Sequence, residues 1–566
     1  MEKNDKTPDR AEPGQDVTRR EFVKTGALAT AGIITGAPAF LRGQNLNSKM
    51  NIAFIAAGGR AGASMQSLTR PAGGRGAPPA APAGRGFGAR GGGAAAAAAA
   101  AAQPDENVTV LCDVNQNALD NAGNRFPQAK KYTDYRRVFD TPNDFDSVVV
   151  ATPEHHHAIP TYLALTMGKH VYCEKPLTYN VWEARLIRET AAKYPNLSTQ
   201  MGNQGHASTA RRTIREILQT GVIGPVREVH VWAHRSWGLQ WASPAQRFGG
   251  DWDRAHGFYR APGSKPGELG VQIVDRFPGT MPFPPRDVVN GPHTPELFDL
   301  WLGPAPVRPY HATYFPGPRW YRWWDFANGT MSDLGSHDND APYTVLDIWQ
   351  EVAGKRILAP TTIESVSPIA VAHRELAPAT MMVTYEYAAV GNQPALKLVW
   401  HQGESKPPMW TEDMGTRSAL FIGDKGMLTG GGQLLPLSGG AGGGGGRGGG
   451  GRGGRGGAAP GQAAPAPAGP FADFQTPPET IPRSPGHWVE WVQYAKGISK
   501  TPPGSNFQYS GWTTEANHLG NVAYRTGKKI QWDYVNMRAT NAVSEAAPFI
   551  KRPQYRKGWN GILPGS

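Results

Sequence analysis

The stretch Gly168-Lys169-His170-Val171-Tyr172-Cys173-Glu174-Lys175-Pro176 decides the fold. Its first part is rich in strand-forming residues, and an acid, a lysine and a proline end it. A helical pattern follows over 181–193. This order places Glu174 and Lys175 at the carboxyl end of a strand. In an open α/β sheet, that edge is where ligands bind.

The sequence before this stretch repeats the alternation of strand and helix. Short apolar segments that begin at Met50 and that span 107–113 and 145–151 predict buried strands, and helical patterns occupy 115–126 and 158–167. Strands that alternate with helices are joined by crossovers, which predicts a parallel sheet.

A glycine-rich turn, Ala56-Ala57-Gly58-Gly59-Arg60-Ala61-Gly62, follows the first predicted strand. A dinucleotide site needs this order, because glycines let the backbone approach the pyrophosphate and the helix N-terminus supplies free N–H groups. Ala56 and Ala61 stand where the first and third glycines of the G-x-G-x-x-G pattern belong. We expect alanine at the first position to strain the turn.

Asp113 ends the second predicted strand, 55 residues after Gly58. Residues 71–102 are almost pure Gly, Ala, Pro and Arg and predict a surface insertion; without these 32 residues the spacing is 23. An acid about 20 residues beyond the glycines bonds the ribose hydroxyls and repels a 2′-phosphate, so Asp113 favours NAD over NADP. Its alternative role is to cap the next helix.

Three adjacent histidines, His155 to His157, suggest a metal site at first sight. Adjacent side chains diverge on any regular element, so we expect no metal and interpret the stretch as a loop at the same sheet edge, with His157 starting a helix. Cys112 and Cys173 fall in predicted strands, which predicts two core residues rather than a disulfide or a zinc site.

The motifs Ala151-Thr152-Pro153, His157, Gly168-Lys169-His170-Val171 and Glu174-Lys175-Pro176 resemble the Gfo/Idh/MocA oxidoreductase family. The resemblance implies an α/β protein with an N-terminal Rossmann domain over 50–202. It also implies a C-terminal α/β domain over 203–566 with an open-faced, mostly antiparallel sheet. It implies NAD as cofactor, with NADP as the alternative. The implied cofactor-binding residues are Gly58, Gly59, Arg60, Asp113, Thr152, Pro153, His157, Glu174 and Lys175.

The second half of the chain predicts the other domain. Residues 224–232 alternate between apolar and polar and predict its first strand, while the loop-rich residues 235–320 are expected to build a wall of the substrate cleft. The remaining elements expected are strands at 363–371, 380–387, 395–401 and 418–428 and helices at 487–496 and 512–526. A second insertion, 436–470, is also rich in Gly, Ala, Pro and Arg.

Asp333 and His337 are spaced i, i+4 in Gly329-Thr330-Met331-Ser332-Asp333-Leu334-Gly335-Ser336-His337, which predicts that both lie on one face of a helix. The pair resembles the family's D-x-x-x-H motif. The resemblance implies that Asp333 holds substrate hydroxyls, that His337 is the acid/base, and that Lys175 joins them as the third catalytic residue. A purely structural pair is the alternative.

Trp320-Tyr321-Arg322-Trp323-Trp324-Asp325-Phe326 is the densest aromatic patch. Sugar rings stack on aromatic faces and bond to charged groups, so Arg322, Trp323 and Trp324 are predicted to bind substrate together with Asp333. Ordinary packing at a domain junction is the alternative.

The first 39 residues predict an export signal. Thr18-Arg19-Arg20-Glu21-Phe22-Val23-Lys24 is a twin-arginine pattern, an apolar run follows over 26–40, and Ala37-Pro38-Ala39 is a cleavage site. The apolar run is too short for a membrane span. We therefore expect a periplasmic or extracytoplasmic protein, exported folded and without a membrane anchor.

The net charge of +12 invites a nucleic-acid interpretation, and three arginines lie in RGG-like repeats. Half of this charge, however, comes from six arginines in the two tracts 71–102 and 436–470. The rest of the chain is mildly basic, so we expect no nucleic-acid partner. RGG-mediated RNA binding is the alternative.

Together the patterns and the resemblance predict a hydride transfer between a secondary hydroxyl of a sugar or polyol and nicotinamide. One alternative is a redox-neutral glycosidase that uses NAD, an activity the resemblance also allows. Another is a non-catalytic nucleotide- or sugar-binding protein, which Ala56 favours. The resemblance also implies a homo-oligomer formed through the open sheet face.

Overall fold

The structure is a computed structural model. It describes residues 49–69, 104–234, 283–287, 291–310, 314–315, 319–348, 350–352, 355–357, 359–367, 376–391, 393–437 and 469–566. The predicted export signal 1–39, the insertion 71–102 and nearly all of 436–470 lie outside the described residues. The expectations for these three segments therefore stay predictions.

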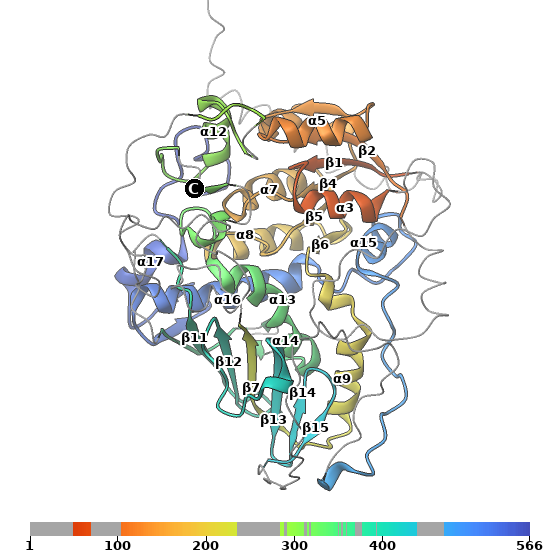
Figure 1. Cartoon of the computed structure of the whole chain (residues 1–566), viewed down its shortest axis with the longest axis vertical. Helices are drawn as coiled ribbons and strands as arrows, with labels where there is room; N and C mark the ends of the chain where they lie inside the picture. Colours follow the sequence, from red (N-terminus) through yellow and green to blue (C-terminus); the bar gives the residue numbers. More distant parts are fainter. Residues whose placement is uncertain are drawn as a thin grey trace, which may run out of the picture. The chain divides into compact units, whose positions relative to one another are not determined.

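The described N-terminal residues form a six-stranded parallel sheet (Figure 1). Its strand order is β3-β2-β1-β4-β5-β6, with β1 at the centre between β2 and β4. The strands are β1 Asn51–Ile55, β2 Asn107–Cys112, β3 Lys130–Tyr132, β4 Ser147–Val150, β5 His170–Cys173 and β6 Thr199–Met201. Every residue of β4 and β5 is buried, as expected for central strands with both faces covered. The predicted Rossmann domain with a parallel sheet is confirmed.

Helices cover both faces of this sheet (Figure 1). Alternate strand residues point to opposite faces, so Val148 and Val150 belong to one core cluster and Val149 to the other. The helices are α3 Arg60–Leu68, α5 Gln116–Arg125, α6 Tyr135–Val138, α7 Ala158–Thr166 and α8 Val181–Ala192. Leu165 of α7 and Ile187 of α8 pack on the first face.

Two C-terminal segments return to the Rossmann domain, so the predicted boundary at residue 203 does not separate the two cores. Trp491 and Val492 of α15, His487–Ala495, pack on the sheet face that contains Val149. Tyr555 and Trp559 join the core on the opposite face. Apolar side chains indicate that a segment is buried, but they do not indicate which sheet it packs on. The position of these segments late in the sequence suggested the second sheet, which is wrong.

The second sheet has nine strands in the described residues, in the order β15-β14-β13-β7-β12-β11-β10-β16-β17. All neighbours are antiparallel except β7 and β12, which confirms the mostly antiparallel sheet. The strands are β7 Val226–Ala233, β10 Thr362–Val366, β11 Met381–Tyr387, β12 Leu396–Gln402, β13 Arg417–Gly423, β14 Met427–Thr429, β15 Leu434–Leu435, β16 Ile530–Asp533 and β17 Arg538–Ala539; β8 Gln350–Val352 pairs separately with β9 Lys355–Ile357. The single strand predicted over 418–428 is in fact the hairpin of β13 and β14.

One face of the second sheet packs against helices. These are α9 Thr209–Gln219, α13 Ser336–Asp338, α14 Asp340–Leu346, α16 Phe507–Thr526 and α17 Val543–Ile550, and α12 Pro295–Leu302 lies in the loop-rich region. Part of the opposite face is covered by residues 403–416, because Trp232 Nε1 donates to the Gly415 carbonyl at 3.0 Å. The face expected to be open is therefore partly occupied by the chain itself.

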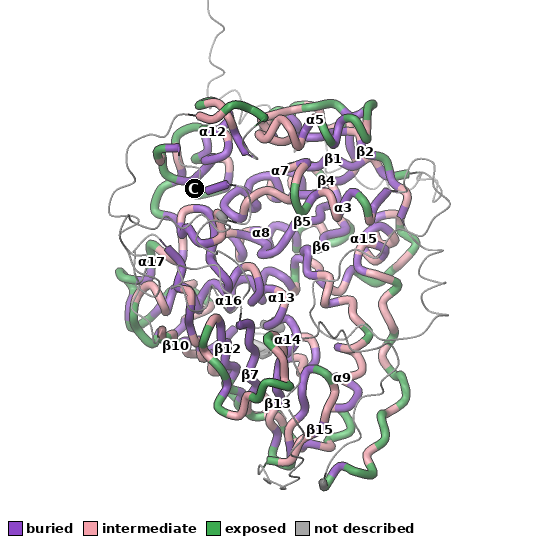
Figure 2. Tube along the Cα trace, in the orientation of Figure 1, coloured by how far each residue is buried: buried purple, intermediate pink, exposed green. Residues whose placement is uncertain are grey.

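Helix α16 joins the two cores, and it is buried along most of its length (Figure 2). Phe507 packs in the Rossmann core, while Leu519 and Val522 pack in the core of the second sheet. The helix begins five residues earlier than predicted because Asn506 caps it, accepting from Gln508 N at 3.0 Å. Among the helices of the described residues, none is long and apolar enough to cross a membrane.

Candidate active site

A cavity of about 1210 Å³ runs along the carboxyl edge of the parallel sheet. Nearly all predicted site residues line it: Gly58, Gly59, Arg60, Asp113, Thr152, Pro153, His157, Glu174, Lys175, Asp333 and His337. Residues that lie far apart in the sequence, from the first glycine turn to β13, therefore share one space. Three predicted residues, Arg322, Trp323 and Trp324, do not line it.

The glycine turn forms one end of this cavity. Gly59 has φ +54° and caps α3, and no side chain caps the first N–H groups of this helix. A Cβ at Gly58 would lie 2.8 Å from Ala118 Cβ, so only glycine lets the two segments pack this closely. An uncapped helix N-terminus behind a close-packed glycine turn suits an anionic diphosphate.

Ala56 has φ +80°, a conformation that L-residues other than glycine rarely adopt. This is the strain expected for alanine at the first position of the motif. The left-handed region costs a residue with a Cβ about 1–2 kcal/mol, while glycine costs about 0.5–1 kcal/mol in unfolded-state entropy.

Ala56→Gly is therefore expected to raise the free energy of unfolding by about 0.5–1 kcal/mol, measured by urea denaturation. Ala63→Gly, in the middle of α3, is the control and should lower it by about 1 kcal/mol. Destabilisation by Ala56→Gly would show that the turn is not strained.

Asp113 closes the turn from the second strand. Its Oδ2 accepts from Ala57 N at 2.8 Å and Gly58 N at 3.1 Å, and its Oδ1 accepts from Asn115 N at 2.8 Å. Burial raises the pKa of the Asp113 carboxyl, although these three N–H groups oppose the change. Helix α5 is capped by Asn115 and not by Asp113, because the Asn115 side chain accepts from Asn117 N and Ala118 N. Asp113 is thus left to brace the turn at the cavity wall.

The three histidines are buried and neutral. His157 Nδ1 lies 2.7 Å from the Pro176 carbonyl and its Nε2 lies 2.8 Å from the Thr152 carbonyl, so the ring spans two loops of the sheet edge. Burial lowers the pKa of His156 and of His157 to about 4. Within the described residues, no group of three or more His, Cys, Asp or Glu side chains could hold a metal ion.

Glu174 and Arg60 form an ion pair at the cavity wall, with Arg60 Nε 3.1 Å from Glu174 Oε1. Glu174 is buried, and burial raises its pKa while Arg60 and Lys175 oppose the change. A Cβ at Gly202 would lie 2.5 Å from Glu174 Oε2 and 3.0 Å from its Cα. The glycine at the end of β6 therefore makes room for this acid.

Lys175 lies between the cofactor side and the second domain. Its Nζ donates to Tyr321 Oη at 3.1 Å and to the Asp333 carbonyl at 3.1 Å, and it forms a short ion pair with Asp333 Oδ1. Only 7% of the Lys175 side chain is exposed. The sheet edge thus supplies a buried cation that is fixed by the second domain.

Asp333 and His337 both face the cavity, but a regular α-helix does not place them. Met331–Gly335 is a π-helical turn, and α13 begins at Ser336. The predicted helix is therefore wrong in type, although the shared face is right. Single π-turns of this kind are frequent at functional sites. Burial lowers the pKa of His337 well below its usual value, and Lys175 and Arg417 add to the effect. The imidazole is thus neutral and can accept a proton.

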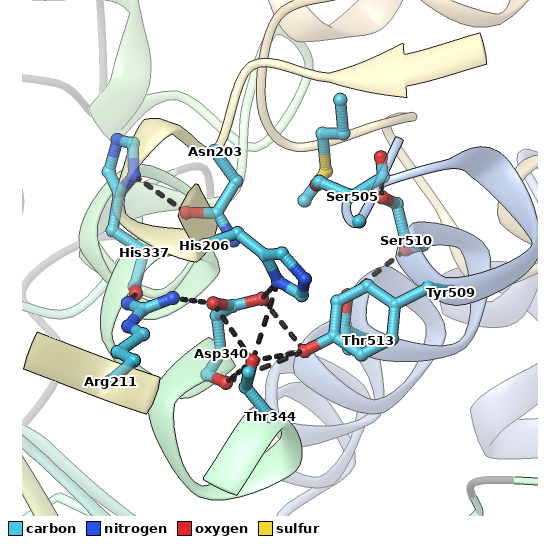
Figure 3. A network of polar contacts seen from close by, with 12 residues as sticks. Asn203, His206, Arg211, His337, Asp340, Thr344, Ser505, Tyr509, Ser510 and Thr513 are labelled. Carbon is cyan, nitrogen blue, oxygen red and sulfur yellow. Dashed lines mark hydrogen bonds and ion pairs between the residues drawn. The ribbon is translucent and has the colours of Figure 1, made fainter. Parts of the chain in front are cut away.

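A buried polar network holds His337 in place (Figure 3). Asn203 Oδ1 lies 3.3 Å from His337 Nδ1, and Arg211 donates to the His337 carbonyl at 2.6 Å. Arg211 also forms an ion pair with Asp340, which accepts from Tyr509 Oη at 2.8 Å. The backbone and one ring nitrogen of His337 are therefore held by Arg211 and Asn203.

Glu154 is a buried acid that the sequence did not indicate. Its Oε1 accepts from Ser332 Oγ at 2.5 Å and its Oε2 from Asn328 Nδ2 at 3.3 Å. Burial raises the pKa of Glu154 to about 8, although Ser332 and Lys175 oppose the change. Between its unfolded pKa and about 8, the folded protein holds a proton that the unfolded chain releases, so the free energy of unfolding falls as pH rises through this window.

Glu154→Gln has no proton to lose, so it should be more stable than the wild type at about pH 8 by roughly 2–4 kcal/mol and nearly equal at about pH 5. Urea denaturation across this range measures the difference. Glu364→Gln, at an exposed position of β10, is the control. Parallel pH profiles for Glu154→Gln and the wild type would contradict the assignment.

The predicted substrate-binding residues Arg322, Trp323 and Trp324 are buried away from the cavity, which corrects their placement there. Trp323 packs in an aromatic cluster with Phe326, and Arg525 lies 4.9 Å from the Trp324 ring. The neighbours Trp320 and Tyr321 line the cavity instead. The residues turn at Arg319–Arg322, so adjacent aromatic side chains point in different directions, which composition does not reveal.

The cavity also contains residues that carried no sequence signal. Arg417 of β13 donates through Nε to both oxygens of Asp338, at 2.8 and 2.6 Å. Trp301 and Trp559 line the cavity as well, and Trp301 confirms in part that the loop-rich residues 235–320 form a cleft wall. Lone arginines and tryptophans in segments without a motif cannot be assigned to a site before the fold is known.

The residues present fit NAD. The turn offers glycines at close approach and an uncapped helix N-terminus for the diphosphate, and Asp113 lies at the end of β2, where a ribose hydroxyl is bound. Thr152 Oγ1 and Glu174 Oε2 are buried at the cavity and have no hydrogen-bond partner in the described part of the chain. These orphaned polar atoms suit a polar ligand along the sheet edge.

Two stretches of the chain match family models of oxidoreductases. Residues 85–202 match an oxidoreductase family with an NAD-binding Rossmann fold, and residues 286–393 match the C-terminal alpha/beta domain of that oxidoreductase family. These two stretches are thus similar to the N-terminal NAD-binding Rossmann domain and the C-terminal domain of the Gfo/Idh/MocA oxidoreductases.

Individual relatives match shorter parts. A levoglucosan dehydrogenase of Pseudarthrobacter phenanthrenivorans is 29% identical over 117 residues, which are 21% of this chain and 30% of that protein. A D-xylose 1-dehydrogenase (NADP(+)) of Hypocrea jecorina is 40% identical over 99 residues, which are 17% of this chain and 25% of that protein. The matched stretches thus span less than a third of either relative.

Among solved structures, the WlbA dehydrogenase of Bordetella pertussis, in complex with NADH and UDP-GlcNAcA, has a TM-score of 0.47 at 12% identity. The alignment covers 86% of this chain and 99% of that chain.

Proposed function

We propose that this chain is an exported NAD-dependent oxidoreductase that oxidises a secondary hydroxyl of a sugar or polyol. One observation carries the proposal: a single cavity joins the glycine turn and Asp113 to Lys175, Asp333 and His337. The family matches and the sugar dehydrogenases among the relatives support it. NADP is the alternative cofactor, and the carboxylate of Asp113 favours NAD.

The cofactor half of the cavity is built from the sheet edge. The turn at Gly58 and Gly59 would hold the diphosphate, and Asp113 would hold a ribose. Thr152, Pro153 and His157 line the next loop, and Glu174 and Lys175 follow at the end of β5. When bound there, NAD accepts a hydride from the substrate carbon.

The catalytic half lies at the π-turn. His337 is neutral, so it can take the proton of the reacting hydroxyl. Asp333 orients substrate hydroxyls and pairs with Lys175. The ammonium of Lys175 offsets the negative charge that develops on the reacting oxygen. Trp320 and Tyr321 offer aromatic faces on which a sugar ring can pack.

The test is to incubate the purified full chain with NAD⁺, and separately with NADP⁺, and with levoglucosan, D-xylose or myo-inositol. We expect reduced nicotinamide to form with at least one of them. Hydrolysis of nitrophenyl glycosides without net reduction of NAD⁺ would replace the proposal by the glycosidase alternative. If neither reaction occurs and no nicotinamide nucleotide binds, a non-catalytic binding protein is left.

Export is part of the proposal and rests on the twin-arginine pattern at Arg19 and Arg20 and on the cleavage site at Ala37-Pro38-Ala39. Fractionation of cells that express the full chain tests it. We expect the mature protein outside the cytoplasm with its N-terminus near residue 40. Full-length protein in the cytoplasm alone would contradict the localisation and leave the activity untouched.

A further inference from the structure

The glycine turn and Asp113 set the direction in which a bound dinucleotide lies along the sheet edge. The strand order is β3-β2-β1-β4-β5-β6; the turn follows β1, and Asp113 and Lys175 follow β2 and β5. The ribose held by Asp113 therefore belongs to the adenosine half, and the nicotinamide half points the other way, toward Lys175. Asp113 N also donates to the Tyr132 carbonyl at the end of β3, at 3.1 Å. The adenine would thus lie beyond Asp113, over the ends of β2 and β3.

A cluster of three rings lines the cavity at that end. Tyr135 begins α6, three residues after β3, and its ring centroid lies 5.6 Å from that of His156 and 5.5 Å from that of Trp559. The ring centroids of His156 and Trp559 are 5.6 Å apart. All three side chains line the cavity. The place expected for the adenine is therefore bounded by aromatic groups.

The end of β2 is connected to this cluster through α12. Val114, which directly follows Asp113, packs against the apolar cluster that contains Trp301 of α12. The Trp301 carbonyl lies 2.7 Å from His156 Nε2. A Cβ at Gly303, just after α12, would lie 2.0 Å from His156 Cε1, so this end of the helix and the histidine are in direct contact. Asp113 and the three rings thus belong to one packed region.

Trp559 comes from the C-terminal segment, which two other elements hold in place. Arg136 of α6 lies 4.3 Å over the Trp559 ring, and its Nη1 donates to the Gly558 carbonyl at 3.1 Å. Arg556 Nε donates to the Gly303 carbonyl at 2.8 Å. Only 2% of Trp559 is exposed. The segment therefore fixes this ring at the cavity wall.

We propose that Tyr135 and Trp559 form the subsite for the adenine of NAD, so that the C-terminal segment is part of the cofactor site. Adenine is flat and aromatic, and contacts with aromatic side chains stabilise a bound base. The inference goes beyond the proposed function, because it concerns the binding of NAD and holds for any reaction that the bound cofactor performs.

The test compares two nucleotides on the purified full chain. NADH carries the adenosine, and reduced nicotinamide mononucleotide lacks it; the fluorescence of each reports its binding. Trp559→Ala should raise the Kd of NADH by about 10-fold or more, the effect of losing one ring that contacts a base, and leave the Kd of the mononucleotide unchanged. Trp559→Phe keeps a ring and should bind NADH more tightly than Trp559→Ala.

Trp182→Ala is the matched control. Trp182 packs against the same core, with its ring centroid 6.1 Å from that of Tyr555 in the C-terminal segment, but it lies outside the cavity. Its removal should change neither Kd, and urea denaturation of both alanine variants compares their losses of stability.

An unchanged Kd of NADH in Trp559→Ala, or an equal rise in Kd for both nucleotides, would overturn the inference and assign Trp559 to packing alone. A wild type that binds no nicotinamide nucleotide would overturn it as well. A wild type that binds NADH but oxidises no sugar or polyol would contradict the proposed function and leave the adenine subsite intact.

Discussion

Lys175→Met is expected to lower kcat/KM for the oxidation by about 10³-fold while NADH affinity stays nearly unchanged. The ammonium is the cation at the junction of the cofactor side and Asp333, and it is bonded to Tyr321 and Asp333. Methionine fills most of the space of the lysine but carries no charge, so the reacting oxygen loses its electrostatic partner. Steady-state kinetics and NADH fluorescence measure the two quantities. Turnover at the wild-type rate would refute the catalytic role of Lys175.

The effect must be separated from a loss of folding. Removing Lys175 leaves the Asp333 carboxylate nearly buried without its cation, a change that can cost about 3–5 kcal/mol of stability. Lys175→Met/Asp333→Asn removes both charges and should recover stability but not activity. Lys169→Ala is the control. Lys169 precedes the same strand, and its Nζ donates to the Phe145 carbonyl outside the cavity, so this variant should keep the wild-type rate.

His337→Ala is expected to lower kcat/KM by about 10²–10⁴-fold, the usual contribution of a general base. The ring is the proposed proton acceptor of the site; Asn203 bonds to one of its nitrogens, and Arg211 bonds to the His337 carbonyl. Added imidazole should restore part of the rate, because the variant leaves a space for it in the cavity. If imidazole does not restore the rate and the variant is unfolded under the assay conditions, His337 has a structural role.

The pH profile of the wild type provides a second measurement on His337. Burial and the neighbouring cations depress its pKa, so the neutral base persists when the solution becomes mildly acidic. The rate should therefore not fall between about pH 8 and about pH 6, where a histidine with an ordinary pKa would begin to protonate. A fall centred near the ordinary histidine pKa would show that the ring is solvated.

Much of the fold follows from local pattern. The apolar segments ending at Ile55, Cys112, Val150 and Cys173 alternate with helices, and this alternation predicts a parallel sheet whose carboxyl edge binds ligands. The glycine turn, Asp113 and Lys175 were found for the same reason, since each directly follows a strand. Strand ends are local features, and a parallel sheet brings them to one edge.

Other features depend on contacts that no local pattern contains. The aromatic patch predicted Trp323 and Trp324 as substrate residues, but the turn before them directs Trp320 and Tyr321 into the cavity. Arg417 joins the site from β13, and the segment around Trp559 returns to the Rossmann core. Each of these placements depends on the path of the backbone or on packing between distant segments, and composition predicts neither.

The sequence by itself thus determined the sheet, its ligand-binding edge and the candidate residues Lys175, Asp333 and His337, because strand periodicity and turn chemistry act over a few residues. Only the tertiary structure decided how these residues are used. In the folded chain Asp333 lies on a π-helical turn instead of the expected α-helix. Lys175 Nζ donates to Tyr321 and Asp333, which come from the other domain. These hydrogen bonds join groups from segments that are distant in the sequence, so they exist only in the folded chain.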